Sequence, residues 1–240
     1  MNFEYFMYQK IAHNTYGSFS KFIIRICTAA VTLSVAAMII STCLMDGFQF
    51  EIKSKVSNFW AHIHIKPYSL TRSMGENPIS ADSTLLRRLK ETKGVRNVQM
   101  VAYKGGIINT AEAFEGTVLR GVSREGMGEL SKFIVSGSMI HAFSDTGRSN
   151  EILISRRIGD KLQLKLNQSL ILSFMGNQIQ RRKFVISGFF NTGIESFDNQ
   201  YTIVNIEAIQ KINRWSADSI HAYEVFIGED MAQKGGESGD

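Results

Sequence analysis

One stretch of this sequence constrains the fold more than any other. No charged residue occurs between Arg25 and Asp46, and the intervening segment Ile26–Met45 is 20 residues long. At about 1.5 Å per residue, a helix of this length spans about 30 Å, the thickness of the hydrocarbon core of a bilayer. Lipid offers backbone groups no hydrogen-bond partners, so a single segment crosses it only as a helix. The sequence therefore predicts a transmembrane helix over residues 26–45.

Small side chains are frequent in this segment. They let a second helix approach closely, so we expect the helix to pack against partner helices rather than stand alone in lipid. The small residues are Ala29, Ala30, Ser34, Ala36, Ala37 and Ser41.

Three other interpretations of the segment compete. A cleaved signal peptide has a shorter apolar core nearer the N-terminus and ends in an Ala-x-Ala site, which is absent here. The stretch before Cys43 loosely resembles a lipid-attachment site, but Thr42 is a poor residue at that position. A core helix of a soluble protein seldom holds 20 uncharged residues. Cys27 and Cys43 lie too far apart on one helix to form a disulfide.

The flanks of the apolar segment are also patterned. Before it, Phe3, Met7 and Ile11 recur every four residues, so residues 1–25 are expected to form an amphipathic segment at the membrane interface. After it, apolar residues keep helical spacing, which predicts a helical stalk over residues 46–60.

Basic residues favour one orientation of this helix. Lys10, Lys21 and Arg25 precede it, whereas Lys53 and Lys55 follow it. The excess of basic residues before the segment favours a cytoplasmic N-terminus. Trp60, at the end of the stalk, is expected at the membrane interface.

The rest of the chain, residues 61–228, alternates short strands and helices separated by Gly, Asn, Asp and Ser. Strands outnumber helices, which indicates an α+β fold in two lobes. The expected helices include one in "SADSTLLRRLKE" with Ser80 as its N-cap and one of about two turns around Ile158 and Leu162. The segment "VRNVQMVAYKGGIINTAE" is expected to form one or two strands with a kink at Gly105-Gly106. A hairpin is expected from "QSLILSF" and "RRKFVISGFF", a strand and then a helix in "NQYTIVNIEAIQKIN", and a last strand in "AYEVFIG". Residues 229–240 are polar and are expected to form a disordered tail.

Motifs of enzyme chemistry are absent. The sequence holds no Gly-Lys dipeptide of a phosphate-binding loop, no G-x-S-x-G elbow and no H-E-x-x-H pair. His62 and His64 would share one face of a strand, but the sequence supplies no third ligand, so no metal is expected. His13, His141 and His221 have no identifiable partner, and Glu151, Glu195 and Asp198 are interpreted as solvated carboxylates. We therefore expect a protein that is not an enzyme and needs no cofactor.

The net charge of +5 is mild and scattered, with no run longer than Arg181–Lys183. Nucleic-acid binding requires clustered basic and aromatic residues, so no nucleic acid is expected as a partner.

A series of segments in order carries a family resemblance: "LMDGFQFEIKSKV", "FWAHIHI", "ISADSTLLRRLKETKGVRNVQ", "GIINTAEAFEGTVLRGV", "EILISRRIGDKLQLKL" and "RRKFVISGFFNTGIESFDNQYTIVNIEAIQKIN". Over residues 5–228 the chain resembles the membrane subunits of lipoprotein-releasing ABC transporters. The resemblance implies a periplasmic core domain of the kind shared with macrolide-exporter permeases, made of a mixed α/β lobe and a mostly-β lobe. It also implies an inner-membrane protein whose residues after about 46 are periplasmic.

The resemblance also implies partners and a site. Members of this family work as two permease subunits with two ATPases; they extract a lipoprotein cargo from the membrane lipid and pass it to a periplasmic carrier. The helix over residues 26–45 would be the first membrane helix, and its candidate cavity-lining residues are Met38, Met45, Gly47 and Phe48. Methionine adapts to varied acyl chains, although lipid-facing or helix-packing roles explain these residues equally well.

The chain departs from the family pattern in two ways. No further apolar segment follows before Asp240, so we expect a fragment, a split subunit or a truncated product. The turn from Phe174 to Arg182 is short, so carrier binding is not assigned to it. The remaining alternatives are a related permease for efflux or cell-wall hydrolase control, and a free-standing membrane-anchored binding or scaffold domain.

Overall fold

The computed structural model describes residues 3–12, 18–67, 78–110, 112–139, 150–176 and 178–228. The chain divides into two compact units after Lys53. The first unit holds α1 (Phe3–Ala12) and the greater part of α2 (Ser18–Trp60), whose last residues belong to the second. The expected tail at 229–240, His13 and His141 lie outside the described residues.

Helix α2 is continuous through the apolar segment and the stretch that follows it. Among the described residues, this is the helix that is long and apolar enough to cross a membrane. Three of its threonine hydroxyls are satisfied within the helix, because Thr28, Thr32 and Thr42 each donate to the carbonyl oxygen four residues earlier at 2.8 Å. Local bonding of this kind pairs these three hydroxyls without water.

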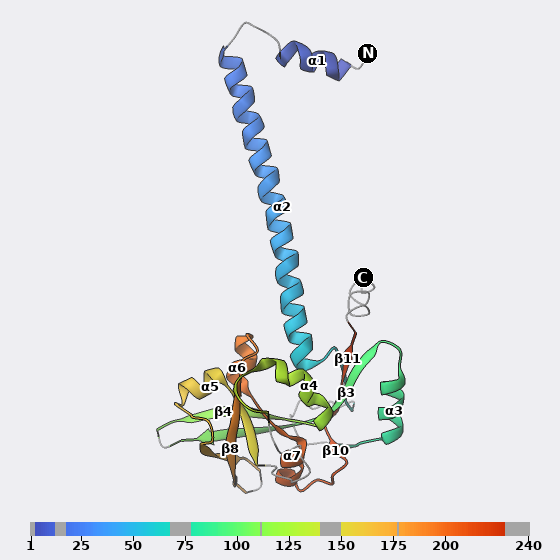
Figure 1. The fold of residues 1–240 in the computed structure, drawn as a ribbon, viewed down its shortest axis with the longest axis vertical. Helices are drawn as coiled ribbons and strands as arrows, with labels where there is room; N and C mark the ends of the chain where they lie inside the picture. Colours follow the sequence, from blue (N-terminus) through green and yellow to red (C-terminus); the bar gives the residue numbers. More distant parts are fainter. Residues whose placement is uncertain are drawn as a thin grey trace. The chain divides into compact units, whose positions relative to one another are not determined.

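The second unit is built on a nine-stranded sheet with the order β1-β11-β3-β4-β9-β6-β8-β5, and with β7 paired to both β3 and β8 (Figure 1). A separate pair joins β2 (Ile79–Ser80) to β10 (Ser219–Ile220). The strands of the large sheet are β1 (Ile63–Ile65), β3 (Val95–Asn109), β4 (Phe114–Val122), β5 (Ile134–Gly137), β6 (Glu151–Ser155), β7 (Ser169–Phe174), β8 (Gln180–Phe190), β9 (Tyr201–Asn205) and β11 (Ala222–Ile227).

Strand β7 closes part of this sheet into a ring. Because β7 bonds β3 on one side and β8 on the other, the strands β3, β4, β9, β6, β8 and β7 follow one another around a closed circuit. Closure removes exposed strand edges. The sheet extends from the ring through β11 and β1, and this extension and the neighbouring α3 (Ser83–Glu91) lie in the same compact unit as the ring.

Buried side chains form two clusters. The first includes Leu119, Ile152, Ile186 and other apolar residues of the ring strands, with Ile209 of α7 (Ile206–Asn213). The partly buried leucines of α3 pack against this cluster.

The second cluster lies around Phe59 near the end of α2 and includes Val101, Val122 and Ile203. Two short helices contribute to it: Met127 and Leu130 come from α4 (Met127–Leu130), and the partly buried Phe197 from α6 (Glu195–Gln200). The fold class expected from the sequence, α+β after an N-terminal apolar helix, is confirmed.

One local prediction was wrong, one was left open and one helix was missed. Asp82, not Ser80, caps α3, accepting from Thr84 N at 2.7 Å and Leu85 N at 3.3 Å, because a cap must directly precede the first helical residue. The sequence left open whether the stretch around Gly105-Gly106 forms one strand or two, and it forms one, β3. An added Cβ at Gly106 would lie 2.9 Å from the Phe174 ring, so close packing explains this glycine. Helix α6 was not predicted; α5 (Arg156–Lys161) was.

Candidate functional site

The candidate cavity-lining residues all lie on α2 within the first unit, and all are exposed. At about 100° of rotation per residue, Met38 and Met45 share one side of the helix, and Phe48 lies about 80° around from Met38. Gly47 lies on the side opposite Met38. The structure thus gives three of the four positions a roughly common direction but brings no other side chain to them among the described residues.

A more distinctive arrangement lies in the second unit, where α2 ends. Phe59 is fully buried. Its ring stacks on Phe197 with centroids 5.3 Å apart and on Phe190 at 6.2 Å. Trp60 is partly buried and meets Tyr201 edge to face at 5.0 Å, with Tyr103 at 5.7 Å. Trp60 therefore packs against the protein domain, which explains its position at the end of the helix without a membrane interface.

Beneath these rings lies a buried arginine. Arg120 of β4 is fully buried, and its guanidinium carbon lies 4.8 Å from the centre of the Phe59 ring and 5.3 Å from that of Trp60. A cation over an aromatic face is attracted by the ring quadrupole. The Nε and Nη1 atoms of Arg120 have no hydrogen-bond acceptor among the described residues, whereas Nη2 donates to Glu224.

Glu224 of β11 is the centre of a polar network and is also fully buried. Its carboxylate accepts from Arg120, from the Gln99 amide and, at 2.6 Å, from the Tyr103 hydroxyl. Strand register explains the meeting: Gln99 pairs with Glu224 across β3 and β11, and Tyr103 pairs with Arg120 across β3 and β4. Residues at alternate positions share a face, so all four side chains reach the same side of the sheet.

We call this arrangement the helix-end socket. It consists of Phe59, Trp60, Tyr103, Arg120, Phe197, Tyr201 and Glu224.

The electrostatics of the helix-end socket favour a neutral Tyr103 and a charged Arg120. Burial raises the pKa of Tyr103 well above its ordinary value, and Glu224 raises it further, so the phenol remains a donor. Burial alone would lower the pKa of Arg120, but the Glu224 carboxylate and Tyr103 outweigh that effect and raise it. Arg120 therefore stays charged, as a buried cation does when it is paired.

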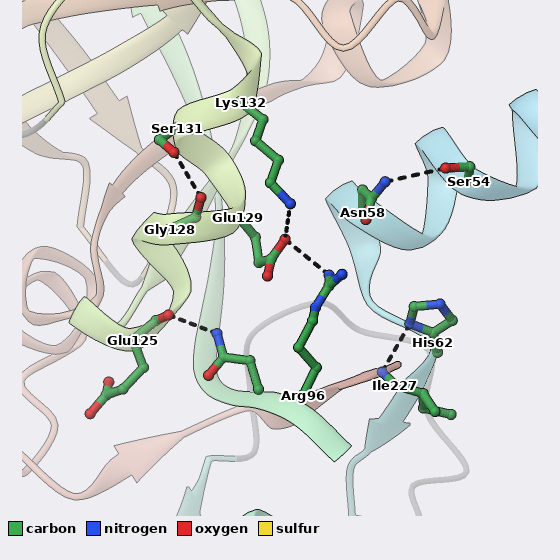
Figure 2. Close-up of polar contacts among 11 residues, drawn as sticks. Ser54, Asn58, His62, Arg96, Glu125, Gly128, Glu129, Ser131, Lys132 and Ile227 are labelled. Carbon is green, nitrogen blue, oxygen red and sulfur yellow. Dashed lines mark hydrogen bonds and ion pairs between the residues drawn. The ribbon is translucent and has the colours of Figure 1, made fainter. Parts of the chain in front are cut away.

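A two-residue turn connects α2 to the sheet. Ala61 has a φ of 63°, the left-handed conformation that commonly ends helices, and it is itself buried. The next residue, His62, donates its backbone N–H to Val225 O at 3.1 Å, and its Nδ1 accepts from Ile227 N at 3.3 Å (Figure 2). The chain thus enters the sheet beside the end of β11 with no flexible linker.

Charged residues from two further elements surround this turn. Arg96 of β3 contacts Glu129 of α4 at 3.0 Å, and Lys132 contacts the same carboxylate at 2.9 Å (Figure 2). Burial lowers the pKa of His62, Arg96 lowers it further, and Glu129 opposes both effects. The neutral ring is the form that accepts the Ile227 N–H.

The two histidines noted in the sequence do not converge on a common ion. His62 bonds Ile227, whereas His64 pairs across the strands with Glu224, whose carboxylate lies 3.9 Å from its Nδ1. Among the described residues, no group of three or more histidine, cysteine or acidic side chains is arranged to hold a metal.

Two interpretations of isolated polar residues were wrong. Asp198 is buried rather than solvated, and its Oδ1 accepts from the backbone N and the hydroxyl of Thr192, both at 3.0 Å. His221 accepts the backbone N–H of Tyr103 at 2.8 Å.

Sequence reasoning missed Arg120 and Glu224. The available signal was a charged residue inside a short apolar strand, in "TVLRGV" and "AYEVFI". A strand pattern does not show whether the face that carries the charge is covered.

Comparison with known proteins places this chain in a family. A family model described as the MacB-like periplasmic core domain matches residues 26–233, so the chain belongs to this family. It therefore carries the periplasmic core domain found in ABC-transporter permeases. The N-terminal apolar helix and this domain fit a protein of the inner membrane.

Two curated relatives are more specific. The lipoprotein-releasing system transmembrane protein LolC of Neisseria meningitidis serogroup B (strain ATCC BAA-335 / MC58) is 23% identical over 208 residues, which is 82% of this chain and 48% of that protein. LolC of Buchnera aphidicola subsp. Schizaphis graminum (strain Sg) is 20% identical over 204 residues, with the same coverage. The chain spans about half the length of the curated relatives it matches. The resemblance seen in the sequence is confirmed.

Solved structures of similar proteins include the periplasmic region of MacB from Actinobacillus actinomycetemcomitans, with a TM-score of 0.49, 11% identity and coverage of 72% of this chain and 78% of that one. The extracellular domain of the noncanonic ABC-type transporter YknZ from Gram-positive bacteria has a TM-score of 0.48, 16% identity and coverage of 71% and 86%.

Proposed function

We propose that this chain is a membrane subunit of an ABC transporter that releases lipoproteins from the inner membrane. Hydrolysis of ATP by a partner ATPase would drive extraction of the cargo, with a second permease subunit completing the complex and a periplasmic carrier receiving the lipoprotein. The observation that carries the proposal is the match to LolC, which spans 82% of the chain. The N-terminus would be cytoplasmic and residues after about 46 periplasmic.

The domain organisation follows the same proposal. Residues 1–25 would lie at the interface, residues 26–45 would cross the membrane, and residues 46–60 would form a helical stalk to the core domain at 61–228. Continuous helix from Ser18 to Trp60 supports this assignment, because no break separates the apolar segment from the helix-end socket.

The cargo would contact one side of α2. Met38 and Met45 are 68% and 56% exposed and lie on the same side of the helix, and Phe48 is 62% exposed. Flexible thioethers and an aromatic ring suit acyl chains of varied length. We propose that Met38, Met45 and Phe48 line the lipoprotein cavity. Gly47, which the sequence analysis placed with them, lies on the opposite side of α2 and is left out of this surface.

Site-specific photo-crosslinking in native membranes tests the proposal. A photoreactive amino acid at Met38 or Met45 should crosslink to a triacylated lipoprotein identified by mass spectrometry. The matched control is Ile40, which is 66% exposed and lies on the opposite side of α2 from Met38. Equal labelling at all three positions would remove the cavity assignment.

Purification of the tagged chain tests its partners. An ATPase subunit that copurifies in stoichiometric amount, together with bound lipoprotein, is the expected result. An ATPase without lipoprotein would favour an efflux or hydrolase-control permease, and neither partner would favour a membrane-anchored binding or scaffold domain.

A further inference from the structure

The Arg120–Glu224 pair is not explained by stability. Neighbours in the same cluster, including Val101, Val122 and Ile203, are apolar and fully or almost fully buried. Removing two charges from water costs several kcal/mol for each ion, and replacing a buried ion pair by apolar residues of similar volume is often neutral or stabilising. An ordinary core would have placed two apolar side chains here, so the charges require another reason.

The position of the pair suggests that reason. Glu224 belongs to β11, its two further donors Gln99 and Tyr103 to β3, and Arg120 to β4. The Arg120 guanidinium lies against both aromatic residues at the end of α2. Three adjacent strands and the helix end therefore meet at one charge cluster.

Directional contacts differ from apolar contacts in what they resist. Hydrophobic burial is non-directional, so a helix end held only by apolar packing can rotate or slide at low cost. Charge-assisted hydrogen bonds and cation–π contacts have preferred geometries. Only Ala61 separates the helix from His62, whose backbone N–H is bonded to β11. The connection between α2 and the sheet is therefore short.

We infer that Arg120 and Glu224 are positioning residues that fasten the end of α2 to strands β4, β3 and β11, so that displacement of the helix end is carried into the sheet. The source of that displacement, a partner ATPase, rests on the proposed function; the fastening does not. Phe59 and Trp60 are the side chains of α2 that contact the Arg120 guanidinium.

The test separates fastening from stability. Trp60 and Trp215 are the two tryptophans of the chain, so Trp215→Phe leaves Trp60 as its sole tryptophan, whose fluorescence is excited separately from that of the tyrosines. In this background, full-length chain in nanodiscs would carry Arg120→Met with Glu224→Leu, an apolar pair. Urea unfolding measures stability, and time-resolved fluorescence anisotropy measures the mobility of Trp60.

The double variant is expected to unfold at a urea midpoint equal to or above that of the parent, while the slow anisotropy component of Trp60 is lost. The single variant Arg120→Met leaves Glu224 buried without its cation and should lower the midpoint. A stable double variant whose Trp60 remains as immobile as in the parent would overturn the inference.

A second variant decides the question if the double variant does not fold. Tyr103→Phe keeps the ring beside Trp60 and removes only the hydroxyl that donates to Glu224. Increased mobility of Trp60 in Tyr103→Phe supports the fastening role, and unchanged mobility contradicts it. Neither reading requires cargo or ATPase, so failure of the proposed transport function would leave this result intact.

Discussion

Truncation of Phe59 gives the largest single effect that the helix-end socket predicts. The side chain is fully buried and its ring has five aromatic neighbours with centroids between 5.3 and 6.4 Å away, those of Trp60, Phe133, Phe190, Phe197 and Tyr201. Phe59→Ala removes the buried ring and leaves a cavity that these rigid neighbours cannot fill. The expected loss of unfolding free energy is about 3–5 kcal/mol.

That loss is a large part of the stability of a domain, which is about 5–15 kcal/mol. For a unit of this size it corresponds to a fall in Tm of about 6–20 °C. Urea unfolding of the full-length chain in detergent, followed by circular dichroism of the sheet, measures it. The matched control is Phe114→Ala on β4, where the side chain is 76% exposed and the change should stay within about 0.5 kcal/mol. If the two substitutions cost the same, the end of α2 does not pack in the helix-end socket.

Three further predictions concern the same unit. Folding lowers the pKa of His62 below its ordinary 6.5, so the unfolded chain binds a proton more readily than the folded chain. As the pH is lowered below 6.5, the free energy of unfolding should therefore decrease until the folded-state pKa is passed. His62→Gln should flatten this part of a profile of Tm against pH. Gly121→Ala places a Cβ 2.9 Å from the Ile206 backbone and should cost about 1–3 kcal/mol in urea unfolding, whereas Gly116→Ala on the same strand, with open space around it, should not. Asp82→Ala removes the cap of α3 and should lower the free energy of unfolding by about 1 kcal/mol, whereas Asp82→Asn, which keeps a side-chain acceptor, should retain most of that stability. An equal loss in the Ala and Asn variants would show that the capping hydrogen bond does not stabilise the helix.

Much of the architecture could be predicted from local patterns. Uncharged length predicted the apolar helix, and short apolar segments bounded by turn residues predicted β9, β11 and the hairpin of β7 and β8. The leucine spacing of residues 83–91 predicted α3. These predictions succeeded because a segment's periodicity depends on its own residues and on the presence of one covered face.

Partnerships between distant segments could not be predicted in the same way. β7 has an ordinary strand pattern, and nothing within it shows that it pairs with two strands and closes a ring. Asp198 was interpreted as solvated because an acidic residue near the end of a strand usually is. It is buried instead, and its carboxylate accepts from the backbone N and the hydroxyl of Thr192.

The sequence by itself determined where the chain could meet lipid, which segments were helices or strands, and the family to which it belongs. Only the tertiary structure decided that Arg120 and Glu224, 104 positions apart, lie together beneath the end of α2. A single strand shows a charge on one of its faces, but the register of β4, β3 and β11 determines which charges meet, and packing of Phe59 and Trp60 determines that water is excluded from them. Both depend on contacts between segments far apart in the chain, which local patterns do not encode.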